Sequence, residues 1–342
     1  MIKITKNSKL MIWGPSQEVR SGGAEIINKF AAYMKSLGAN AKMFNWDTLV
    51  YEQPEYYKNL YDVNCGSWKE IEDDENCIIM IPEIMVEDKT ALNFFCNYKH
   101  TQLIIWWLSS AFDYNDLTIK NSKRLQFSQL KSIEDHCLFL YENEVCARDL
   151  LYHGINNRMR LQHGVHPLFY SYPKQSEKKN KVIYNACKEI NKVFVDKIKK
   201  QLPDIEFIEI AGNANNYKGK EELISMYDEA KVYIDFNGFE GREMCPREAA
   251  LRNCVLILGN AGNAETFDDY PIPSWYKVEY FTEEGITDTC NKIIECLNNY
   301  DEHLQDMNLF KRKCLLEPRE WENLVYLIFG EMIPDENKLI LY

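Results

Sequence analysis

Residues 233–264 read YIDFNGFEGREMCPREAALRNCVLILGNAGNA. Their order predicts an apolar strand that ends at Phe236, a loop that contains glycine, and a helix that Pro246 opens and that runs to Arg252. A second apolar strand follows at residues 255–258, and a Gly-Asn loop leaves it. A strand, a helix and a parallel strand in succession form the repeating unit of an open α/β sheet.

The same alternation extends from this segment in both directions. Near the amino terminus, an apolar strand at residues 10–13 enters the loop 14–23, and an amphipathic helix that ends at Gly38 follows. Further strands are expected at residues 41–44, 77–81, 103–108, 137–141, 158–162, 182–186 and 206–211, and further helices at residues 144–153, 189–202 and 220–229. The sequence therefore predicts an α/β fold with parallel sheets covered by helices.

The alternation is interrupted once, at residues 171–181 (SYPKQSEKKNK), where Pro, Ser and Lys accumulate. This composition is typical of a solvated linker. We therefore expect an N-terminal domain of residues 1–172 and a C-terminal domain that begins at residue 180. Two such domains leave a cleft between the carboxyl ends of their strands, where open α/β sheets bind ligands.

Composition excludes several classes of protein. The chain has 342 residues, 46% hydrophobic and 13% aromatic, which is too apolar for a disordered polyelectrolyte. Its 40 basic and 52 acidic residues give a net charge of −12, which disfavours nucleic acid as a partner. The longest apolar run, residues 103–108, is too short to span a bilayer, and residues 1–13 lack the apolar core of a signal peptide, so we expect a cytoplasmic protein.

Cysteine and histidine spacing argues against a metal site. The eleven cysteines are scattered, odd in number and never spaced C-x-x-C, so they are interpreted as reduced thiols. Of the six histidines only His163 and His166 lie close together, and no cysteine or carboxylate cluster at ligand spacing accompanies them. No metal and no other cofactor is expected, and these two histidines are expected to cap or pack.

The loop EGREMCPRE carries the residues best suited to binding a ligand. Glu240 and Glu248 are separated by seven residues. A helix N-terminus exposes N–H groups and a partial positive charge, so the amides of residues 243–245, with Arg242 or Arg247 nearby, can hold a phosphate. Glu248 can accept hydrogen bonds from vicinal hydroxyls. Taken alone, a glutamate near a helix start also has a purely structural interpretation, because it favours the helix dipole and caps amides.

EGREMCPRE resembles the E-x7-E motif of GT-B glycosyltransferases, in particular the family-4-like retaining enzymes. The segment RSGGAE, residues 20–25, resembles the Gly-Gly loop near the amino terminus of the same enzymes. The resemblance covers most of the chain and implies two Rossmann-like domains that face each other across a cleft. It implies an acceptor-binding domain of residues 1–172, a nucleotide-sugar-binding domain of residues 180–315, and a terminal helix within residues 316–342 that returns to the first domain.

The resemblance also implies roles for individual residues. Glu240 would contact the donor sugar as the catalytic residue, and Glu248 would contact the ribose of the nucleotide. Lys188, with Lys192 as a weaker candidate, would bind the diphosphate. The remaining donor-binding residues would act through their backbone or by close approach: Gly22, Gly23, Gly241, Arg242, Glu243, Met244 and Cys245.

The chain departs from the family pattern in two places. Many members have an arginine before the lysine, where this chain has Asn185. Many also have a histidine in the loop after a central strand, where residues 108–115 read LSSAFDYN. Ser109, Ser110 and Asp113 are all candidates for the polar role there.

The implied function is transfer of a sugar from a nucleotide-diphosphate sugar, of the UDP or GDP type, to a saccharide or lipid-linked acceptor in polysaccharide or glycoconjugate synthesis. Fixed amides, Lys188 and Arg242 would stabilise the departing diphosphate, which suits a retaining, metal-independent reaction. A nucleotide-sugar epimerase of the same fold and a non-catalytic nucleotide- or sugar-binding protein are the alternatives. A nicotinamide oxidoreductase is less favoured, because RSGGAE is not G-x-G-x-x-G.

Two further groups of residues are interpreted structurally. Trp106 and Trp107 lie inside an apolar strand and are expected in the core. The lysines at positions 178, 179, 181, 197, 199 and 200 and the segment 311–313 are expected to be solvated faces. Such faces leave peripheral contact with anionic lipid head groups open.

Overall fold

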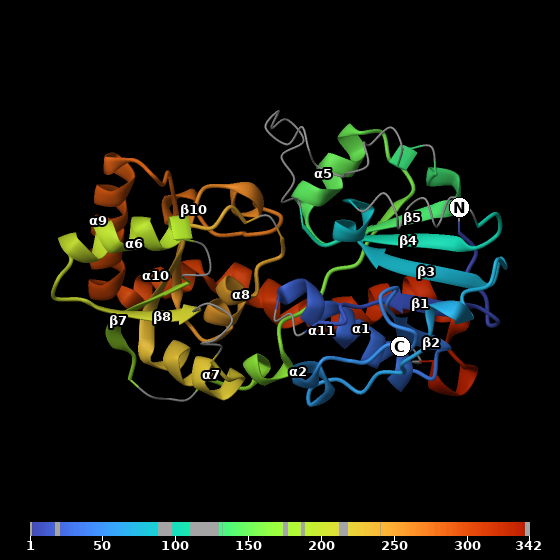
Figure 1. Ribbon diagram of the computed structural model, residues 1–342. Coiled ribbons are helices and arrows are strands. Elements are labelled where there is room, and N and C mark those ends of the chain that lie inside the picture. Colours follow the sequence, from blue (N-terminus) through green and yellow to red (C-terminus); the bar gives the residue numbers. More distant parts are fainter. Residues whose placement is uncertain are drawn as a thin grey trace. The chain divides into compact units, whose positions relative to one another are not determined.

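A computed structural model describes residues 2–17, 21–87, 98–109, 130–131, 133–173, 177–185, 189–211, 218–239 and 241–338. The chain folds as two compact units (Figure 1). The first unit combines Met1–His163 with Glu320–Tyr342, and the second is Gly164–Arg319.

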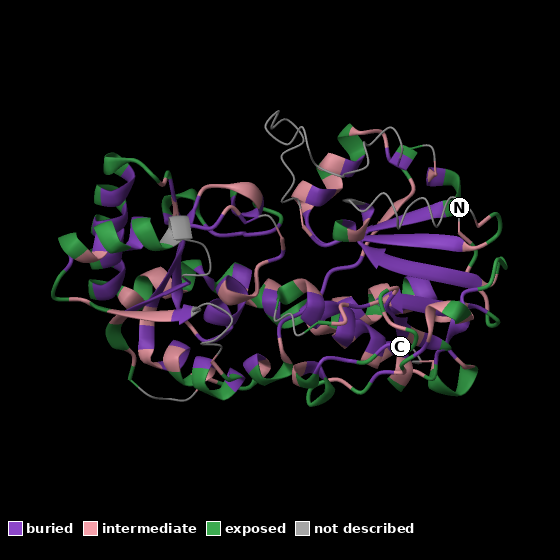
Figure 2. Ribbon diagram, in the orientation of Figure 1, coloured by how far each residue is buried: buried purple, intermediate pink, exposed green. Residues whose placement is uncertain are grey.

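The first unit is built on a parallel sheet of strand order β2-β1-β3-β4-β5-β6. Its strands are β1 (Lys9–Trp13), β2 (Ala41–Phe44), β3 (Cys77–Pro82), β4 (Gln102–Trp107), β5 (Cys137–Tyr141) and β6 (Arg158–Arg160). Its described helices are α1 (Gly22–Ser36), α2 (Glu55–Lys58), α5 (Glu144–Tyr152) and the end of α11 (Asn308–Phe329). Every residue of β3 and β4 is buried, as expected of strands covered on both faces (Figure 2).

The end of α11 completes the core of the first unit. Trp321 is buried, stacks on Trp106 with ring centroids 6.0 Å apart, and meets Phe30 edge-on at 6.0 Å. Phe329 contacts Phe30 at 5.3 Å. In Figure 1 the red end of the chain accordingly lies among the blue elements of this unit. Residues from the two ends of the sequence therefore share one core.

The second unit has a parallel sheet of order β11-β10-β9-β7-β8. Its strands are β7 (Lys179–Asn185), β8 (Glu206–Ala211), β9 (Ala230–Asp235), β10 (Val255–Gly259) and β11 (Lys277–Val278). Its helices are α6 (Glu189–Gln201), α7 (Lys220–Glu229), α8 (Met244–Leu251), α9 (Glu283–Asn298), α10 (Tyr300–Asp306) and the start of α11. Short 3-10 helices complete the two units at Trp68–Glu70, Glu83–Glu87, Glu134–His136, Pro167–Tyr170, Gly262–Glu265, Ser274–Tyr276, Gly330–Met332 and Asp335–Asn337.

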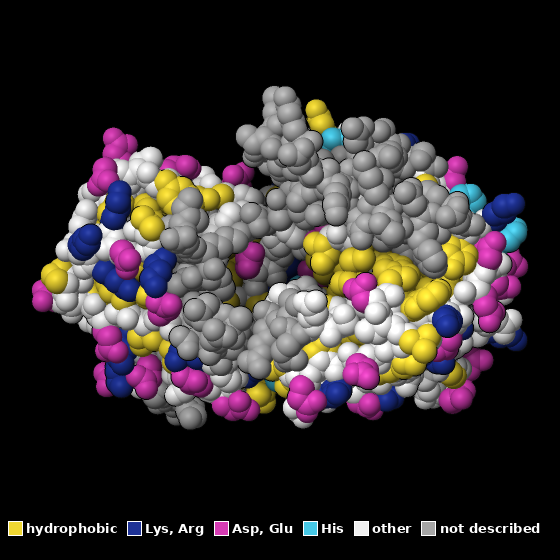
Figure 3. Space-filling model, in the orientation of Figure 1, with side chains coloured by type: hydrophobic (Ala, Val, Ile, Leu, Met, Phe, Trp, Pro, Cys, Tyr) yellow, Lys and Arg dark blue, Asp and Glu magenta, His cyan; other side chains and the backbone are white. Residues whose placement is uncertain are grey.

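The predicted α/β class, with a parallel sheet in each of two Rossmann-like units, is confirmed. Trp106 and Trp107 are buried in β4, as predicted. Within the described ranges no helix is long and apolar enough to cross a bilayer. Acidic and basic side chains are interspersed over the face that Figure 3 shows.

One lysine predicted to be solvated is held inside the second unit. Lys178 donates from Nζ to the backbone carbonyls of Tyr227 and Ala230, both at 2.8 Å, and of Arg252 at 2.7 Å. Burial lowers the pKa of Lys178. The strand β7 begins at the next residue, so the segment predicted as linker ends earlier than expected. The lysine-rich composition concealed a residue that ties α7, β9 and the end of α8 together.

Candidate functional site

The candidate site in the second unit lies where β9 and β10 end. These neighbouring parallel strands pair Asp235 with Leu258, so the loops that leave their carboxyl ends lie side by side. The amide of Asn263 donates to the carbonyl of Phe239 at 3.0 Å, and its side-chain Nδ2 donates to the carbonyl of Gly241 at 2.7 Å. The loop that contains the EGREMCPRE sequence is thus fastened to the Gly-Asn loop.

Gly262 allows this close approach. Its φ is +51°, and a Cβ built at this position would lie 2.2 Å from the carbonyl oxygen of Gly238 and 2.6 Å from that of Phe239. Contacts this short do not occur with a side chain, and both obstructing atoms are backbone. The second loop can pack against the first only with glycine at this position.

Helix α8 begins two residues earlier than predicted, at Met244, with Glu243 at the N-cap. Pro246 is therefore the third helical residue, where its missing N–H costs no intrahelical hydrogen bond. The side chains of Glu243, Met244 and Cys245 are partly exposed. The first turn of α8 can therefore offer amides and a partial positive charge to an anion.

Glu248 lies in the second turn of α8 rather than in the first. Its side chain is buried, with 2% of its surface exposed, and Oε2 accepts from the hydroxyl of Tyr227 at 3.5 Å. The same hydroxyl lies 3.4 Å from the carbonyl oxygen of Cys245. Tyr227 thus connects Glu248 to the start of the helix. The predicted contact of Glu248 with a ribose stays a prediction.

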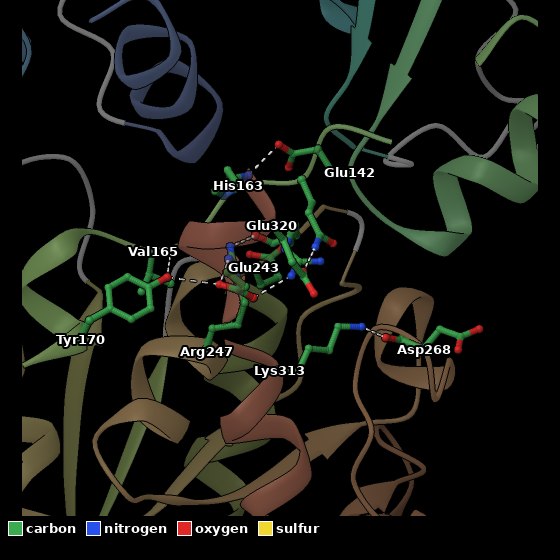
Figure 4. A network of polar contacts seen from close by, with 12 residues as sticks. Glu142, His163, Val165, Tyr170, Glu243, Arg247, Asp268, Lys313 and Glu320 are labelled. Atoms are coloured by element: carbon green, nitrogen blue, oxygen red, sulfur yellow. Dashed lines mark hydrogen bonds and ion pairs between the residues drawn. The ribbon is translucent and has the colours of Figure 1, made fainter. Parts of the chain in front are cut away.

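Arg242 and Arg247 are both buried and both bind Glu317, a residue of α11 that sequence reasoning missed. Figure 4 draws this network, with Arg247 and Tyr170 labelled. Burial is the largest influence and lowers the pKa of Arg247, but the charge of Glu317, together with smaller contributions from Cys314, Tyr270 and Tyr170, raises the net pKa. The guanidinium that was predicted to meet a phosphate is therefore also a structural cation.

A signal for Glu317 was present in the sequence. The buried face of this part of α11 carries Phe310, Cys314, Glu317 and Trp321 at helical spacing. A carboxylate at a core position of an amphipathic helix implies a buried cationic partner.

Asp235 occupies the buried carboxyl end of β9. Oδ2 accepts from the hydroxyl of Tyr233 at 2.6 Å and from Nδ2 of Asn185 at 3.4 Å, and Oδ1 accepts from the amide of Asn237 at 3.1 Å. Burial and then the charge of Asp235 raise the pKa of Tyr233. Asn185, in the stretch where many members of the resembling family have an arginine, is therefore a partner of this carboxylate.

Several buried polar atoms around the two loops have no hydrogen-bond partner among the described residues. They are Asn237 Oδ1, Arg242 Nε, Asn263 Oδ1 and Tyr270 Oη. Buried polar atoms without partners are rare in proteins and are commonly satisfied by a ligand or by ordered water. Donors and acceptors both occur in this set, as recognition of a polar ligand requires.

In the first unit, Gly22 and Gly23 form the first turn of α1, which Ser21 caps through a 3.3 Å hydrogen bond from the amide of Ala24. Among the described residues, a Cβ at Gly23 would meet only Leu108 Cδ1, at an ordinary 3.6 Å. Packing within the described part of the chain therefore does not require glycine at position 23. The predicted close approach of a donor to these glycines is untested.

Two glutamates follow directly on strands of the first sheet, and both are buried. Glu83 follows β3 and accepts from the amide of Leu108 at 3.0 Å, and Glu142 follows β5. Glu142 Oε1 lies 2.6 Å from Nδ1 of His163, which is also buried (Figure 4). A carboxylate in this position fixes the orientation of the imidazole ring. Glutamate immediately after an apolar strand was the sequence signal that was overlooked.

The other histidine of the pair has a capping role, as predicted. His166 accepts from the amide of Leu168 at 3.4 Å, at the start of the 3-10 helix Pro167–Tyr170.

Four of the predicted site residues lie outside the described residues: Glu240, Lys188, Ser110 and Asp113. Ser109 follows β4 and is described. Within the described part of the chain, no three His, Cys, Asp or Glu side chains gather as metal ligands.

Comparison with known proteins identifies the fold. No protein-family model and no curated protein matches the chain. Sucrose-phosphate synthase from Thermosynechococcus elongatus is similar with a TM-score of 0.68 and 10% identity, over 94% of this chain and 98% of the synthase. HepE from Anabaena, determined in complex with UDP, is similar with a TM-score of 0.58 and 8% identity, over 94% of this chain and all of HepE.

TarM is similar with a TM-score of 0.56 and 13% identity over 78% of this chain, which spans only 57% of the TarM chain. The architecture common to these comparisons is that of the GT-B glycosyltransferases, with two Rossmann-like α/β units.

Proposed function

We propose that this chain is a glycosyltransferase of the family-4-like, retaining type. It transfers a sugar from a nucleotide-diphosphate sugar to a saccharide or lipid-linked acceptor, in polysaccharide or glycoconjugate synthesis. The observation that carries the proposal is the loop residues 238–239 and 241–243 with the helix start at residues 244–248, which lie at the carboxyl end of β9 in a fold similar to that of UDP-bound HepE. Ligands of open α/β sheets bind at this edge.

In the proposed mode of binding, the diphosphate meets the first turn of α8 and Lys188. Residues 241–245 provide backbone amides, and the helix dipole and Lys188 provide positive charge. Both stabilise the negative charge that develops on the diphosphate as the glycosidic bond breaks. The protein groups supply this stabilisation themselves, which fits a metal-independent reaction.

Glu240 and Glu248 have different proposed roles. Glu240 contacts the donor sugar, whose anomeric carbon becomes positively charged in the transition state. Glu248 accepts hydrogen bonds from the ribose hydroxyls, held in place by Tyr227. Gly22 and Gly23 permit close approach of the donor to the backbone, and residues of the first unit bind the acceptor.

The two roles are tested with Glu240→Ala and Glu248→Ala, each assayed for nucleotide binding by calorimetry with UDP and GDP and for donor consumption. We expect Glu240→Ala to lose turnover by a factor of about 10² or more while nucleotide binding persists. We expect Glu248→Ala to weaken nucleotide binding itself. Glu222→Ala, at an exposed position on α7, is the matched control and should change neither quantity.

Two results would contradict the proposal. Unchanged turnover in Glu240→Ala would remove that residue from the catalytic site. Interconversion of the donor sugar in the absence of any acceptor would identify an epimerase instead.

A further inference from the structure

Glu317 joins two arginines of the candidate site through separate oxygen atoms. Its side chain is completely buried. Oε1 accepts from Nη2 of Arg242 at 2.6 Å, and Oε2 accepts from Nη1 of Arg247 at 3.0 Å. The hydroxyl of Tyr170 also donates to Oε2, at 3.4 Å. One carboxylate on α11 therefore sets the spacing between a residue of the loop and a residue of α8.

Arg247 transmits this constraint to the backbone at the start of the helix. Its Nη2 donates to the carbonyl of Arg242 at 2.8 Å, and its Nε donates to the carbonyl of Glu243 at 3.0 Å. The backbone of these two residues leads directly into the first turn of α8. By fixing the guanidinium group of Arg247, Glu317 thus also fixes the backbone that leads into the first turn of α8, whose amides can bind an anion.

Burial makes this arrangement depend on Glu317. Both guanidinium groups are buried, and the completely buried carboxylate of Glu317 forms an ion pair with each of them. A buried cation that loses its partner is strongly unfavourable, and the chain relieves this by moving the cation towards water. Movement of Arg247 would take the carbonyl groups of residues 242 and 243 with it.

We propose that Glu317 is a positioning residue for the donor diphosphate: by binding Arg242 and Arg247 together, it holds the first turn of α8 in the conformation that binds the phosphates. This inference rests on the proposed function, because the donor is its ligand. Glu317 itself acts through the arginines and does not touch the donor.

The proposal and simple electrostatics predict opposite effects of Glu317→Gln on the affinity for a nucleoside diphosphate. Loss of a negative charge raises the local positive potential, so electrostatics alone predicts tighter binding of a nucleoside diphosphate. Loss of positioning predicts weaker binding, because amides displaced from the phosphate oxygens no longer form short hydrogen bonds. The direction of the change therefore separates the two.

The test compares the binding of UDP and GDP to wild type, Glu317→Gln and Asp228→Asn by calorimetry, at a temperature where all are folded by circular dichroism. Asp228 binds Arg252 at 2.5 and 2.8 Å in another buried ion pair, at the opposite end of α8. It is therefore a matched control for the loss of a buried carboxylate. We expect Glu317→Gln to weaken binding about tenfold or more and Asp228→Asn to change it less than twofold.

Binding by Glu317→Gln that equals or exceeds that of wild type overturns the positioning role. Equal weakening in Asp228→Asn does so as well, because the effect would then be general destabilisation. If Glu317→Gln does not fold, Glu317→Asp is tested instead, because aspartate keeps the charge but is too short to reach both arginines. Unchanged nucleotide binding by Glu317→Asp would also overturn the positioning role. If the wild type binds neither UDP nor GDP, the proposed function is refuted. If the wild type binds a nucleotide and Glu317→Gln binds it equally well, only the role of Glu317 is refuted.

Discussion

Gly262 shows how one residue without a side chain holds two loops of the second unit together. We expect Gly262→Ala to lower the free energy of unfolding by about 2 to 4 kcal/mol, because a methyl group would combine an unfavourable positive φ with overlap of two backbone carbonyls. Gly154→Ala is the matched control. Gly154 has φ +74° but no atom of the described residues within 4 Å of its built Cβ, so only the backbone strain of about 1 kcal/mol is expected.

The comparison is made by denaturant unfolding of both variants. Equal losses of stability would show that overlap with the Gly238 and Phe239 carbonyls contributes nothing.

For single residues, the sequence predicts which kind of ligand a site could bind better than it predicts which side chains contact one another. The combination of glutamates, arginines and a helix start around residue 245 indicated an anion site. It could not reveal that Arg242 and Arg247 share Glu317, because that carboxylate is about 70 residues away in the chain. Lys178 was misjudged for the same reason, since its three carbonyl acceptors come from other elements.

At the scale of an element, helix α5 carries Asp149, whose ionised side chain lowers the stability of the folded chain at neutral pH. Burial raises the pKa of Asp149 from 3.8 to about 6. At a pH below 3.8, the ordinary pKa of aspartate, the carboxyl group is protonated in both the folded and the unfolded chain, so the free energy of unfolding is unaffected. Between the two values the unfolded state ionises first, so stability falls as pH rises, and above about pH 6 the full loss persists.

Asp149→Asn should therefore be more stable than wild type by about 1 to 2 kcal/mol at pH 7.5, with the advantage shrinking towards pH 4.5. Thermal unfolding of both proteins across this range measures it. An advantage that is the same at every pH would show that Asp149 ionises normally in the folded chain.

Most strands could be predicted because each is a short apolar run between polar loops. The strands β2, β5 and β8 have the predicted bounds. The two-residue strand β11 is too short to show a period, so only its pairing with β10 defines it. Helix α8 began earlier than predicted because proline fits any position of the first turn, and sequence alone does not select one.

At the scale of the whole molecule, the first unit depends on residues from both ends of the chain. We expect Trp321→Ala to cost about 3 to 5 kcal/mol, because it empties the space against Trp106 and Phe30. Hydrogen exchange should show the loss of protection in β1 and β4 and little change in β9. Trp275→Ala, which removes a residue 41% exposed in the second unit, is the control.

Faster exchange in β9 than in β4 after Trp321→Ala would contradict this assignment of the residue to the core of the first unit. Composition predicted a division of the chain near the lysine-rich segment, residues 171–181. The two compact units divide at His163, and the first unit is completed by Glu320–Tyr342, which follow the second.

This arrangement has a consequence for synthesis on the ribosome. The second unit is one continuous segment, Gly164–Arg319, and can fold as soon as it emerges. The first unit is translated earlier but must wait for Trp321 and Phe329 before its apolar face is covered. We therefore expect the first unit to complete its folding after the second, although it is translated first, and its nascent sheet to be the part of this chain that most needs protection by a chaperone.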